Sequence, residues 1–435
     1  MRILVVACGT RGDFQPMLAL ATALRRAGHE VLLAATPTFA SEAAAFEVPF
    51  APVGMDFQAL IARHRSELDP RRPLNAIRLM NRIIPEAIRS EWAALFPLVH
   101  GPELIVAAGA TLTARSAAEA ARVPFRYVAY TPQLLPSAWH PPMMLPIAGT
   151  PRWLNRLGWR SIRPLYDRIL LPTLNRLRQD EGLPPVSCAI RHVFPTEPGV
   201  SLLAVDPEVA PAPPDLPVPQ VGAFHLEDPR PLPAAVEQFL SEGEPPVYLG
   251  FGSMPDTDPE RTSQLLAEAA RRAGCRALLS SGWAGLGTGK LGSHIQVVGP
   301  LSHGALFPRL AGVLHHGGAG TTAASTRAGV PQLVVPHMLD QFMNAHFVRT
   351  AGLGLSLSRK QLGVERLASA LVRLREDSTL RARAAQVGER VRARDSLSAA
   401  VALLEQTAGA AQPSGVTVTS SVNSRDITRS SSSTS

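Results

Sequence analysis

The feature that most constrains the fold is the way the chain begins, with an apolar strand that runs directly into a glycine loop and a helix. Residues Ile3–Cys8 are continuously apolar, which is typical of a parallel strand covered on both faces. After the loop Gly9–Gly12, apolar residues recur at helical spacing from Met17 to Leu24, and Gly28 stands where a helix C-cap glycine belongs. A second apolar run follows at Val31–Ala35. This strand–loop–helix–strand unit predicts an open α/β sheet.

The same alternation of short apolar runs and helical segments recurs along the chain. We predict further strands at 104–107, 127–129, 247–251, 277–280, 295–298, 312–315 and 332–335. Two longer stretches, about 56–99 and 134–182, are predicted to be helical insertions, and a helical region spans about 364–406. The fold class is therefore α/β, with two Rossmann-like domains whose parallel sheets face an interdomain cleft. Ligands of such sheets bind at the carboxyl ends of the strands.

The length of 435 residues also indicates more than one domain, since domains commonly have ~100–200 residues. We expect an N-terminal domain at 1–206 and a proline-rich linker at 207–219. The second domain is expected at 220–385, followed at 386–408 by C-terminal helices that pack back on the first domain. Residues 409–435 are rich in Ser and Thr and are predicted to be a disordered tail.

Composition narrows the class of partner. The net charge is +8, but no nucleic-acid-binding motif is present, so nucleic acid is not expected as a partner. The three cysteines have no disulfide or metal-site spacing. No apolar run reaches the ~18 residues of a spanning helix, and the first run is too short for a signal peptide, so a cytoplasmic protein is expected. The arginine-rich insertions leave two alternatives open, a solvated basic surface or a weak peripheral contact with a membrane.

The strongest functional motif is His315-His316-Gly317-Gly318-Ala319-Gly320-Thr321-Thr322, between an apolar strand and a helical pattern. Glycines let backbone amides approach an anion, and a helix start adds free N–H groups and partial positive charge. With the threonine hydroxyls and the His316 ring, the segment suits a diphosphate; a glycine turn with an ordinary helix cap is the alternative. The chain lacks the spacing of a Walker A loop, and Gly9–Gly12 lacks that of a dinucleotide-binding loop.

Two aspartates stand at the carboxyl ends of predicted strands. Asp340-Gln341 follows the run 332–335, and a carboxylate beside an amide can hydrogen-bond the vicinal hydroxyls of a sugar. Asp13 follows the first strand and is a candidate general base. For both aspartates the alternative is a helix N-cap. For Asp13 such a cap would lower the pKa of the carboxyl and weaken it as a base.

Together these motifs resemble the family 1 nucleotide-sugar glycosyltransferases, which have the GT-B fold. The resemblance covers about residues 1–405. Its most specific parts are Gly9–Pro16, Phe251-Gly252-Ser253, Ser281-Gly282-Trp283, Val298-Gly299-Pro300, His315–Thr322 and Pro336–Gln341. The opening pattern G-x-R-G-D-x-x-P is similar to the sterol and antibiotic glycosyltransferase branch, in which the aspartate is the proposed base.

The resemblance implies an acceptor-binding N-terminal domain and a nucleotide-sugar-binding C-terminal domain. Asp13 would deprotonate the acceptor hydroxyl. The diphosphate would be held by Ser253, His316, Gly318 and Thr321. The backbone of Val298 would contact the nucleobase, and Asp340 and Gln341 would bind the sugar. Trp283 would lie near the donor, with a core aromatic as the alternative. The resemblance implies no metal site.

The chain also departs from parts of the family pattern. Plant members have a base-stacking Trp where this chain has Val298, and a ribose-binding Glu where it has Ala324. They use a histidine base in the first loop, which here contains none. Sterol-type members often have a Trp shortly after Asp-Gln, where this chain has Phe342-Met343-Asn344. This last departure weakens the case for a sterol acceptor.

The expected activity is that of an inverting, metal-independent glycosyltransferase without a bound cofactor. It would move glucose from UDP-glucose to a hydroxyl of an apolar small molecule, such as a polyketide, a sterol-like or a lipid-like natural product. One alternative is a transferase that takes a deoxysugar from a dTDP-sugar in antibiotic biosynthesis. The other is a non-catalytic nucleotide-sugar-binding protein that assists a partner enzyme.

Overall fold

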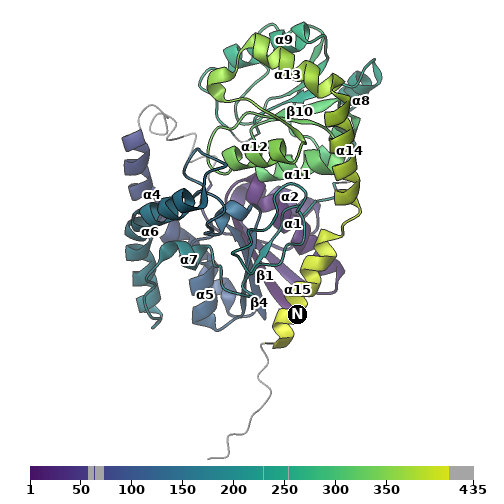
Figure 1. Ribbon diagram of the computed structural model, residues 1–435. Coiled ribbons are helices and arrows are strands. Elements are labelled where there is room, and N and C mark those ends of the chain that lie inside the picture. The colour runs from purple at the N-terminus through teal and green to yellow at the C-terminus, as the bar shows by residue number, and fades with distance from the viewer. Residues whose placement is uncertain (57–62, 64–72, 229, 253, 411–435) are drawn as a thin grey trace, which may run out of the picture.

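The structure, a computed structural model, describes residues 1–56, 63, 73–228, 230–252 and 254–410, and it contains two six-stranded parallel sheets (Figure 1). The first sheet has the order β3-β2-β1-β4-β5-β6 and the second the order β12-β11-β10-β7-β8-β9. The first consists of β1 (Arg2–Cys8), β2 (Glu30–Ala35), β3 (Phe50–Pro52), β4 (Leu104–Gly109), β5 (Phe125–Ala129) and β6 (Ser201–Leu203). The second consists of β7 (Val247–Leu249), β8 (Ala277–Ser280), β9 (Ile295–Val298), β10 (Gly312–His315), β11 (Gln332–Val334) and β12 (Gly354–Ser356). The predicted α/β class with two parallel sheets is confirmed.

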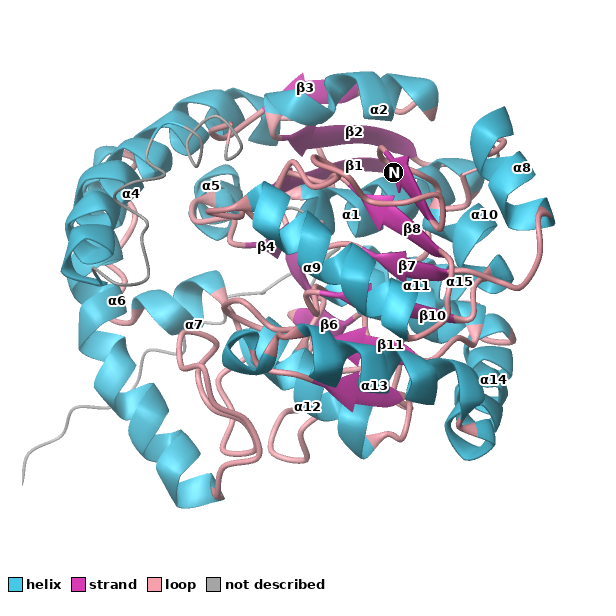
Figure 2. Ribbon diagram, turned by 90° about the horizontal axis from the view of Figure 1, so that it is seen from above, coloured by secondary structure: helices cyan, strands magenta, loops and turns pink. Residues whose placement is uncertain are grey.

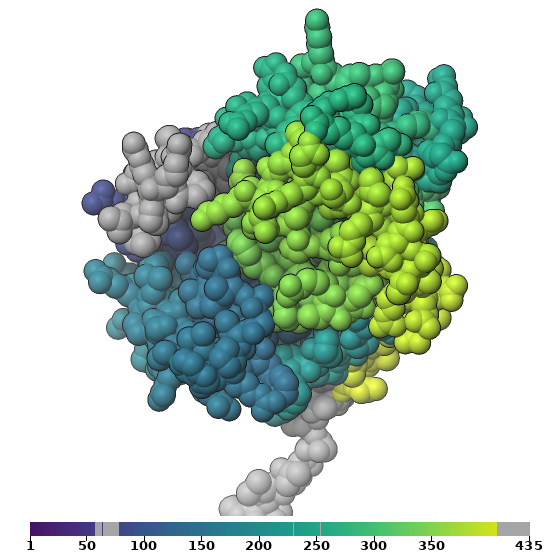
Figure 3. All heavy atoms as spheres, turned by 45° about the horizontal axis from the view of Figure 1, so that its top comes forward, coloured from purple at the N-terminus to yellow at the C-terminus, as the bar shows by residue number. Residues whose placement is uncertain are grey.

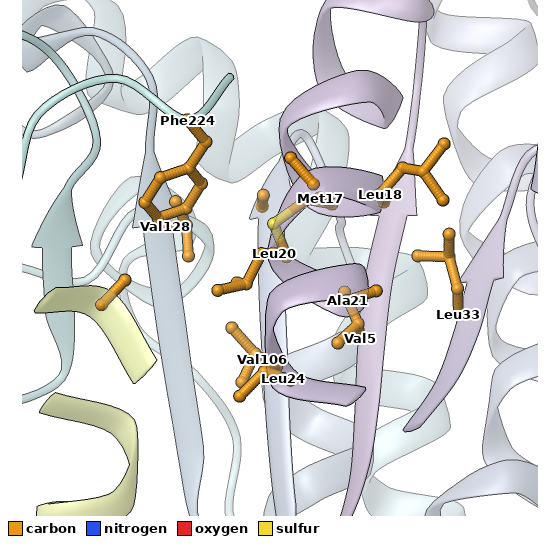
Figure 4. Packing of buried hydrophobic residues seen from close by; sticks show 14 of the residues in the cluster. Val5, Met17, Leu18, Leu20, Ala21, Leu24, Leu33, Val106, Val128 and Phe224 are labelled. Carbon is orange, nitrogen blue, oxygen red and sulfur yellow. The ribbon is translucent and has the colours of Figure 1, made fainter. Parts of the chain in front are cut away.

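The continuous apolar run at the N-terminus is explained by the two cores that β1 separates. Ile3, Val5 and Ala7 point to one side of the sheet, where they pack with α1 (Arg11–Arg26). Leu4, Val6 and Cys8 point to the other side, toward α4 (Pro73–Leu95) and α5 (Ala114–Ala121). Figure 4 shows the first of these cores, with Met17, Leu20 and Leu24 of α1 packed over β1 and β4. Because both faces are covered, the strand has no polar face.

The two insertions form a helical layer on the outer side of the N-terminal domain. The helix α4 packs against α6 (Arg152–Asp180), and both lie along the outer edge of the molecule in Figure 2. The part of the first insertion at 57–62 and 64–72 lies outside the described residues. Within the described residues, no helix is both long and apolar enough to span a membrane.

The remaining helices complete the layers around the two sheets. In the N-terminal half they are α2 (Ala40–Ala45) and α7 (Ala189–Val193). In the C-terminal half they are α8 (Ala234–Ser241), α9 (Pro259–Arg272), α10 (His303–Leu306), α11 (Ala319–Ala328), α12 (Gln341–Thr350), α13 (Val364–Glu376) and α14 (Ser378–Arg392). The short 3-10 turns are Pro37–Phe39, Phe96–Val99, Pro132–Leu134, Phe307–Arg309 and Arg359–Gln361.

The chain passes between the two halves at two neighbouring places. It enters the second half after the proline-rich segment, and it returns through Arg394 to α15 (Ser396–Ala410), which packs on α1 (Figure 1). Ala400, Val401 and Leu404 of α15 belong to the core of the first sheet. Val221 and Phe224 also lie in that core, although they follow the proline-rich segment. The domain limits given above stay a prediction, as does the tail, which from residue 411 lies outside the described residues.

Candidate active site

Asp13 lies in the first turn of α1, next to the carboxyl end of β1. The helix begins one turn earlier than expected: its N-cap is Thr10, and Asp13 is the third helical residue. The Asp13 carboxylate accepts hydrogen bonds from the Thr10 N–H at 2.8 Å and the Thr10 hydroxyl at 3.2 Å. Asp13 is therefore the acidic partner of a capping box rather than the N-cap itself.

Two glycines leave room for this carboxylate between the ends of adjacent strands. A Cβ atom on Gly9 would lie 2.3 Å from Asp13 Oδ2, and one on Gly109 would lie 2.5 Å from Asp13 Oδ1. Gly109 also has φ +65°, a backbone conformation that favours glycine. The carboxyl ends of β1 and β4 thus form a cradle that only small residues permit.

Burial decides the protonation of Asp13. It raises the pKa of the Asp13 carboxyl above its ordinary value, although the hydrogen bonds from Thr10 oppose the shift. The hydrogen bonds of the capping box do lower the pKa, as the helix-cap alternative supposes, but desolvation is the larger effect and the net shift is upward. Tyr130 donates its hydroxyl to the Asp13 carbonyl oxygen at 3.1 Å, and burial raises the pKa of this phenol as well.

The glycine-rich segment connects β10 to α11 as the sequence predicts. Its first residue, His315, is buried and has a structural role: its Nε2 lies 3.0 Å from Gln332 Oε1, and its Nδ1 accepts the Gly317 N–H at 3.1 Å. The N-cap of α11 is Gly318, which has no side chain to occupy the first-turn N–H groups. Those N–H groups have no partner within the helix, and they make its start a site for an anion.

His316 is held beside this helix start. Its ring fits between Gly252 and Gly318, on which added Cβ atoms would lie 2.9 Å from His316 Cε1 and 2.5 Å from His316 Nε2. The Nδ1 atom is buried and has no partner among the described residues. Burial lowers the pKa of His316 to about 3, with smaller effects from neighbouring histidines. The ring is therefore neutral and carries one N–H donor.

The two threonines of the segment differ. Thr322 is buried and returns its hydroxyl to the Gly318 carbonyl at 2.9 Å, so it serves the helix. Thr321 is partly exposed, and its hydroxyl makes no hydrogen bond within the described part of the chain. Thr321 is the residue whose hydroxyl is available to a ligand.

Asp340 stands at the N-cap of α12, but its side chain caps no N–H group there. Instead Asp340 Oδ2 accepts a hydrogen bond from Asn344 Nδ2 at 2.9 Å, and Asn344 also donates to the Gly317 carbonyl at 2.8 Å. Burial, and secondly the negative charge of Asp13, raises the pKa of Asp340 to about 7. The carboxyl is thus positioned by the glycine loop and feels the charge of Asp13 across the two domains.

Gln341 holds the loop that carries Asp340. Its Oε1 accepts the N–H groups of His337 at 2.8 Å and Met338 at 3.0 Å, and its Nε2 lies 3.3 Å from Met254 Sδ. Leu339 has φ +53°, a strained conformation for a residue with a branched side chain. The carboxamide oxygen of Gln341 is already engaged in the loop, so its NH₂ group is the part that remains for a ligand.

The residues predicted to meet the nucleotide lie on the same edge of the second sheet. The Val298 carbonyl, at the end of β9, accepts the Ser281 N–H at 3.0 Å. The Trp283 side chain is partly exposed and lies outside the described apolar cores. The backbone N–H of Trp283 donates to the Gly252 carbonyl at 2.9 Å. Ser253 lies outside the described residues.

The structure therefore places Asp13 opposite Asp340 and the glycine segment that carries His316, where the carboxyl ends of the two sheets face each other. Figure 1 shows α11 and α12 directly above α1, and α1 contacts α11. A cavity between the domains lies next to these residues: Tyr130 and the crossing segment around Asp206 line it from one side, and the start of α11 with Asn344 lines it from the other, but Asp13, His316 and Asp340 are not part of its lining. No group of three His, Cys, Asp or Glu residues within the described ranges is placed to hold a metal ion.

Several residues of the site were not predicted. Gly109, Tyr130 and Asn344 act through contacts between segments that are far apart in the sequence. Asn344 carried the one usable signal, because it follows Asp340 by four residues and side chains at that spacing meet on a helix. The contacts of Gly109 and Tyr130 with Asp13 follow only from the order of the strands.

Comparisons with known proteins agree with this geometry. Residues 3–138 match the glycosyltransferase family 28 N-terminal domain, and residues 282–406 match the erythromycin biosynthesis protein CIII-like C-terminal domain. The chain is 37% identical to vancomycin aglycone glucosyltransferase from Amycolatopsis orientalis, over 82% of this chain and 86% of that protein. It is 33% identical to dTDP-epi-vancosaminyltransferase from the same organism, over 85% of this chain and 89% of that protein.

A solved structure shares the fold. The glycosyltransferase VinC in complex with dTDP superposes with a TM-score of 0.68 at 22% identity, over 94% of this chain and all of that one. The predicted GT-B fold is confirmed. The chain belongs to the GT-B glycosyltransferases related to the enzymes that glycosylate antibiotics.

Proposed function

We propose that this glycosyltransferase moves a hexose, with glucose from UDP-glucose as the first candidate, to a hydroxyl group of an apolar small molecule with inversion at the anomeric carbon. The observation that carries the proposal is the approach of Asp13 and Asp340, one from each domain, close enough for their charges to interact. Inversion needs a base on the face of the sugar opposite the leaving diphosphate, and the approach of the two carboxyls supports Asp13 as that base and Asp340 as a residue that binds the sugar.

In the proposed reaction Asp13 takes the proton of the acceptor hydroxyl. The acceptor oxygen forms a bond to the anomeric carbon as the bond from that carbon to the diphosphate oxygen breaks, and the diphosphate leaves with the electron pair. The raised pKa of Asp13 makes it a stronger base than a free carboxylate. Transfer is late, since even a raised carboxyl remains far more acidic than an alcohol.

The second domain stabilises the leaving diphosphate. The first-turn N–H groups of α11 are not capped by a side chain, and the His316 ring lies beside this helix start. Thr321 belongs to the same first turn and would add its hydroxyl. These groups are fixed before the reaction, so they favour negative charge without reorganisation. In this proposal no metal ion takes part, and Ser253 adds a further donor to the diphosphate.

The sugar hydroxyl groups would meet Asp340 and the NH₂ group of Gln341. Asn344 fixes the orientation of the Asp340 carboxyl, and the strained turn at Leu339 fixes the backbone in front of it. Val298 and Trp283 complete the donor site on the side of the nucleotide. This part of the proposal explains why α12 begins directly at the cleft.

An apolar acceptor would meet apolar side chains of the N-terminal domain. Leu134, Met143, Trp159, Tyr166 and Phe194 surround a cavity of about 10 Å³, which has room for about one water molecule and marks an apolar region rather than a formed acceptor pocket. The side-chain oxygen of Gln133, which also lines it, is buried and has no partner among the described residues. A largely apolar region with few polar groups suits a hydroxylated apolar compound.

A dTDP-sugar is the second candidate donor, because one relative is named as a dTDP-epi-vancosaminyltransferase and another as a glucosyltransferase. The test is to incubate the purified protein with UDP-glucose, dTDP-glucose or dTDP-rhamnose and a panel of hydroxylated apolar compounds, and to identify products by mass. Product from UDP-glucose alone supports the first candidate, and product from dTDP-sugars alone supports the second. If the protein binds these donors but yields no product with any acceptor, even at high protein concentration, the non-catalytic alternative is supported.

His316 provides a test of the donor site that does not depend on the acceptor. Replacing His316 with Ala removes a buried N–H donor beside the helix start, so we expect a donor KM about tenfold higher or a kcat about tenfold lower. The control is His294→Ala. His294 directly precedes β9, at the end away from Val298, and within the described residues its ring hydrogen-bonds the Ala267 carbonyl alone. Equal kinetics for the wild type and His316→Ala would contradict the assignment.

A further inference from the structure

An exposed apolar patch lies on the N-terminal domain, outside the site described above. We define it by Trp139, Met144, Ile147, Trp153 and Leu157. These are five of the eight large apolar side chains that are exposed in the described part of the chain, and Trp153 and Leu157 are 66% and 54% exposed. Single exposed apolar residues are ordinary, but a cluster of this kind marks an interaction surface.

The patch combines a loop with the start of α6. Trp153 and Leu157 are four residues apart and therefore share one face of the helix. The guanidinium group of Arg152 lies 3.6 Å from the centre of the Trp139 ring, which joins the loop to the helix. The two segments form one continuous surface rather than two separate exposures.

This surface is held open by buried contacts beneath it. Asn155 is buried and donates to the carbonyls of Ala138 at 3.0 Å and Thr150 at 3.2 Å. Asp215 accepts the Ser137 hydroxyl at 2.6 Å and the Ala138 N–H at 2.8 Å. Because both ends of the loop are fixed in this way, the apolar side chains cannot turn inward without breaking buried hydrogen bonds.

The charge around the patch is positive on balance. Residues 137–168 contain five arginines and a single acidic residue, Asp167, and the exposed Asp215 adds one carboxylate beside the loop. Asp167 pairs with Arg163, whereas Arg156 and Arg160 are exposed and have no acidic partner in the described ranges. An apolar centre with exposed tryptophans and unpaired arginines beside it is complementary to an anionic lipid surface, where indole rings lie at the headgroup level.

We propose that this patch docks the enzyme on the surface of an anionic phospholipid bilayer. The apolar side chains enter the interface between headgroups and acyl chains, while Arg156 and Arg160 contact the phosphates. Figure 3 shows that the blue part of the N-terminal domain, which contains the loop, adjoins the yellow-green part of the C-terminal domain. Gly149 of the loop packs against His346 of α12, so the docked surface lies beside the cleft.

The docking also explains how an apolar acceptor is supplied. The apolar cavity lined by Met143 and Trp159 lies directly beneath the loop, where Pro142 and Leu145 pack against Gly158 of α6. A compound dissolved in the bilayer would leave it beside the interdomain cleft, which the loop adjoins through Gly149 and His346. This last step rests on the proposed function, whereas binding to the bilayer does not.

The test measures flotation of the full chain with vesicles of phosphatidylcholine, with or without phosphatidylglycerol. We expect binding to the vesicles with phosphatidylglycerol and release at high salt, because exposed charges are screened. Trp153→Ala with Leu157→Ser should weaken binding about tenfold or more. Arg156→Gln with Arg160→Gln should weaken it about fivefold for each arginine at low salt. The control is Arg366→Gln with Arg373→Gln. These arginines lie on the exposed face of α13, so the control removes two positive charges elsewhere and should leave binding unchanged.

Turnover of a water-soluble acceptor separates this proposal from the proposed function. It should be the same in the wild type and in all three double variants, whose melting temperatures should also agree. The proposal fails if the wild type does not float, or if the patch variants float as well as the wild type. It also fails if the patch variants only raise the KM for a soluble acceptor, only break a dimer, or only lose binding to an acidic protein.

Discussion

At the scale of single residues, the site depends on whether burial or hydrogen bonding dominates at two carboxyl groups. Thr10 donates two hydrogen bonds to Asp13, and Asn344 donates one to Asp340. Both contacts favour the ionised form, yet the pKa of each carboxyl is raised because desolvation is the larger effect. The cleft therefore raises the pKa of both acids, as general-base chemistry at neutral pH requires.

Asp13→Asn tests the base. Asparagine keeps the size of the side chain and an oxygen that can accept the Thr10 N–H, so the capping box is largely retained. We expect kcat to fall about 10²–10⁴-fold, the usual contribution of a general base, with little change in Tm or donor Kd.

Thr10→Ala is the matched control for this substitution, because it removes the cap and leaves the carboxyl. It should lower the free energy of unfolding by about 1 kcal/mol and keep most of the turnover. If Asp13→Asn instead behaves like this control, with near-normal kcat and an earlier melt, Asp13 is a helix cap and another group is the base.

Asp340→Asn tests the second carboxyl through the pH dependence of stability. The pKa of Asp340 is raised from 3.8 to about 7, so between these values the folded state holds a proton that the unfolded state has lost. The contribution of this group to stability therefore falls as pH rises from about 4 to 7 and is constant above. Asparagine does not titrate, so the Tm of Asp340→Asn relative to the wild type should rise across that interval in the absence of donor. A Tm difference that does not change with pH would contradict the raised pKa.

At the scale of helices and strands, the sequence predicts those elements whose formation depends on a local pattern of apolar residues. The strands at Ile3–Cys8 and Gly312–His315 are buried on both faces, so their residues are apolar except for His315, and both were predicted. The strands β3, β6 and β12 were not predicted, whereas β7 and β11, which are equally short, were. The latter two lie inside a sheet and belong to longer apolar runs. The strands β3, β6 and β12 each lie at the edge of a sheet, where pairing with a neighbour rather than local preference makes the strand.

The same distinction holds within the site. The glycine segment and the two aspartates were found from the sequence because each follows an apolar run. The sequence did not predict that these segments approach one another, because their approach depends on the way the two domains face each other. The role of Thr10 as N-cap could have been inferred from its position three residues before Asp13, which is the spacing of a capping box.

Leu404→Ala tests whether α15 belongs to the N-terminal core. Leu404 is 1% exposed and packs with α1 residues, so its loss should lower the free energy of unfolding by about 2–5 kcal/mol. Leu403 is the neighbouring leucine and only partly buried, so Leu403→Ala should cost clearly less. Equal effects of the two leucine variants would place α15 away from the core.

A chain that ends at residue 410 should melt like the full chain, because the residues removed have the Ser/Thr-rich composition of a segment without a core.

At the scale of the whole molecule, the relation between the two domains depends on the place where the chain crosses twice. Arg394 follows α14, and it pairs with Asp206 at 3.3 Å and Glu208 at 2.6 Å beside the first crossing. Gly222 lies against the same residues: an added Cβ would be 2.3 Å from Ser396 Oγ and 2.6 Å from Arg394 Cδ. One arginine thus ties the outgoing and returning segments together at the point about which the domains would move.

Arg394→Met tests this tie. Asp206 is 2% exposed, and without Arg394 its only partner among the described residues is the Ala223 N–H, so a buried charge loses its compensation. Because Arg394 itself is a quarter exposed, we expect a loss of about 1–3 kcal/mol in the free energy of unfolding, measured by urea denaturation at neutral pH. The loss should shrink in acid, where Asp206, whose pKa burial raises, is protonated and needs no cation. Adding Asp206→Asn should restore part of the stability, since it removes the uncompensated charge, whereas Arg366→Met on α13 should have little effect. If Arg394→Met and Arg366→Met unfold alike, the two crossings are held by packing alone, and the ion pairs at the crossing do not set how the domains face each other.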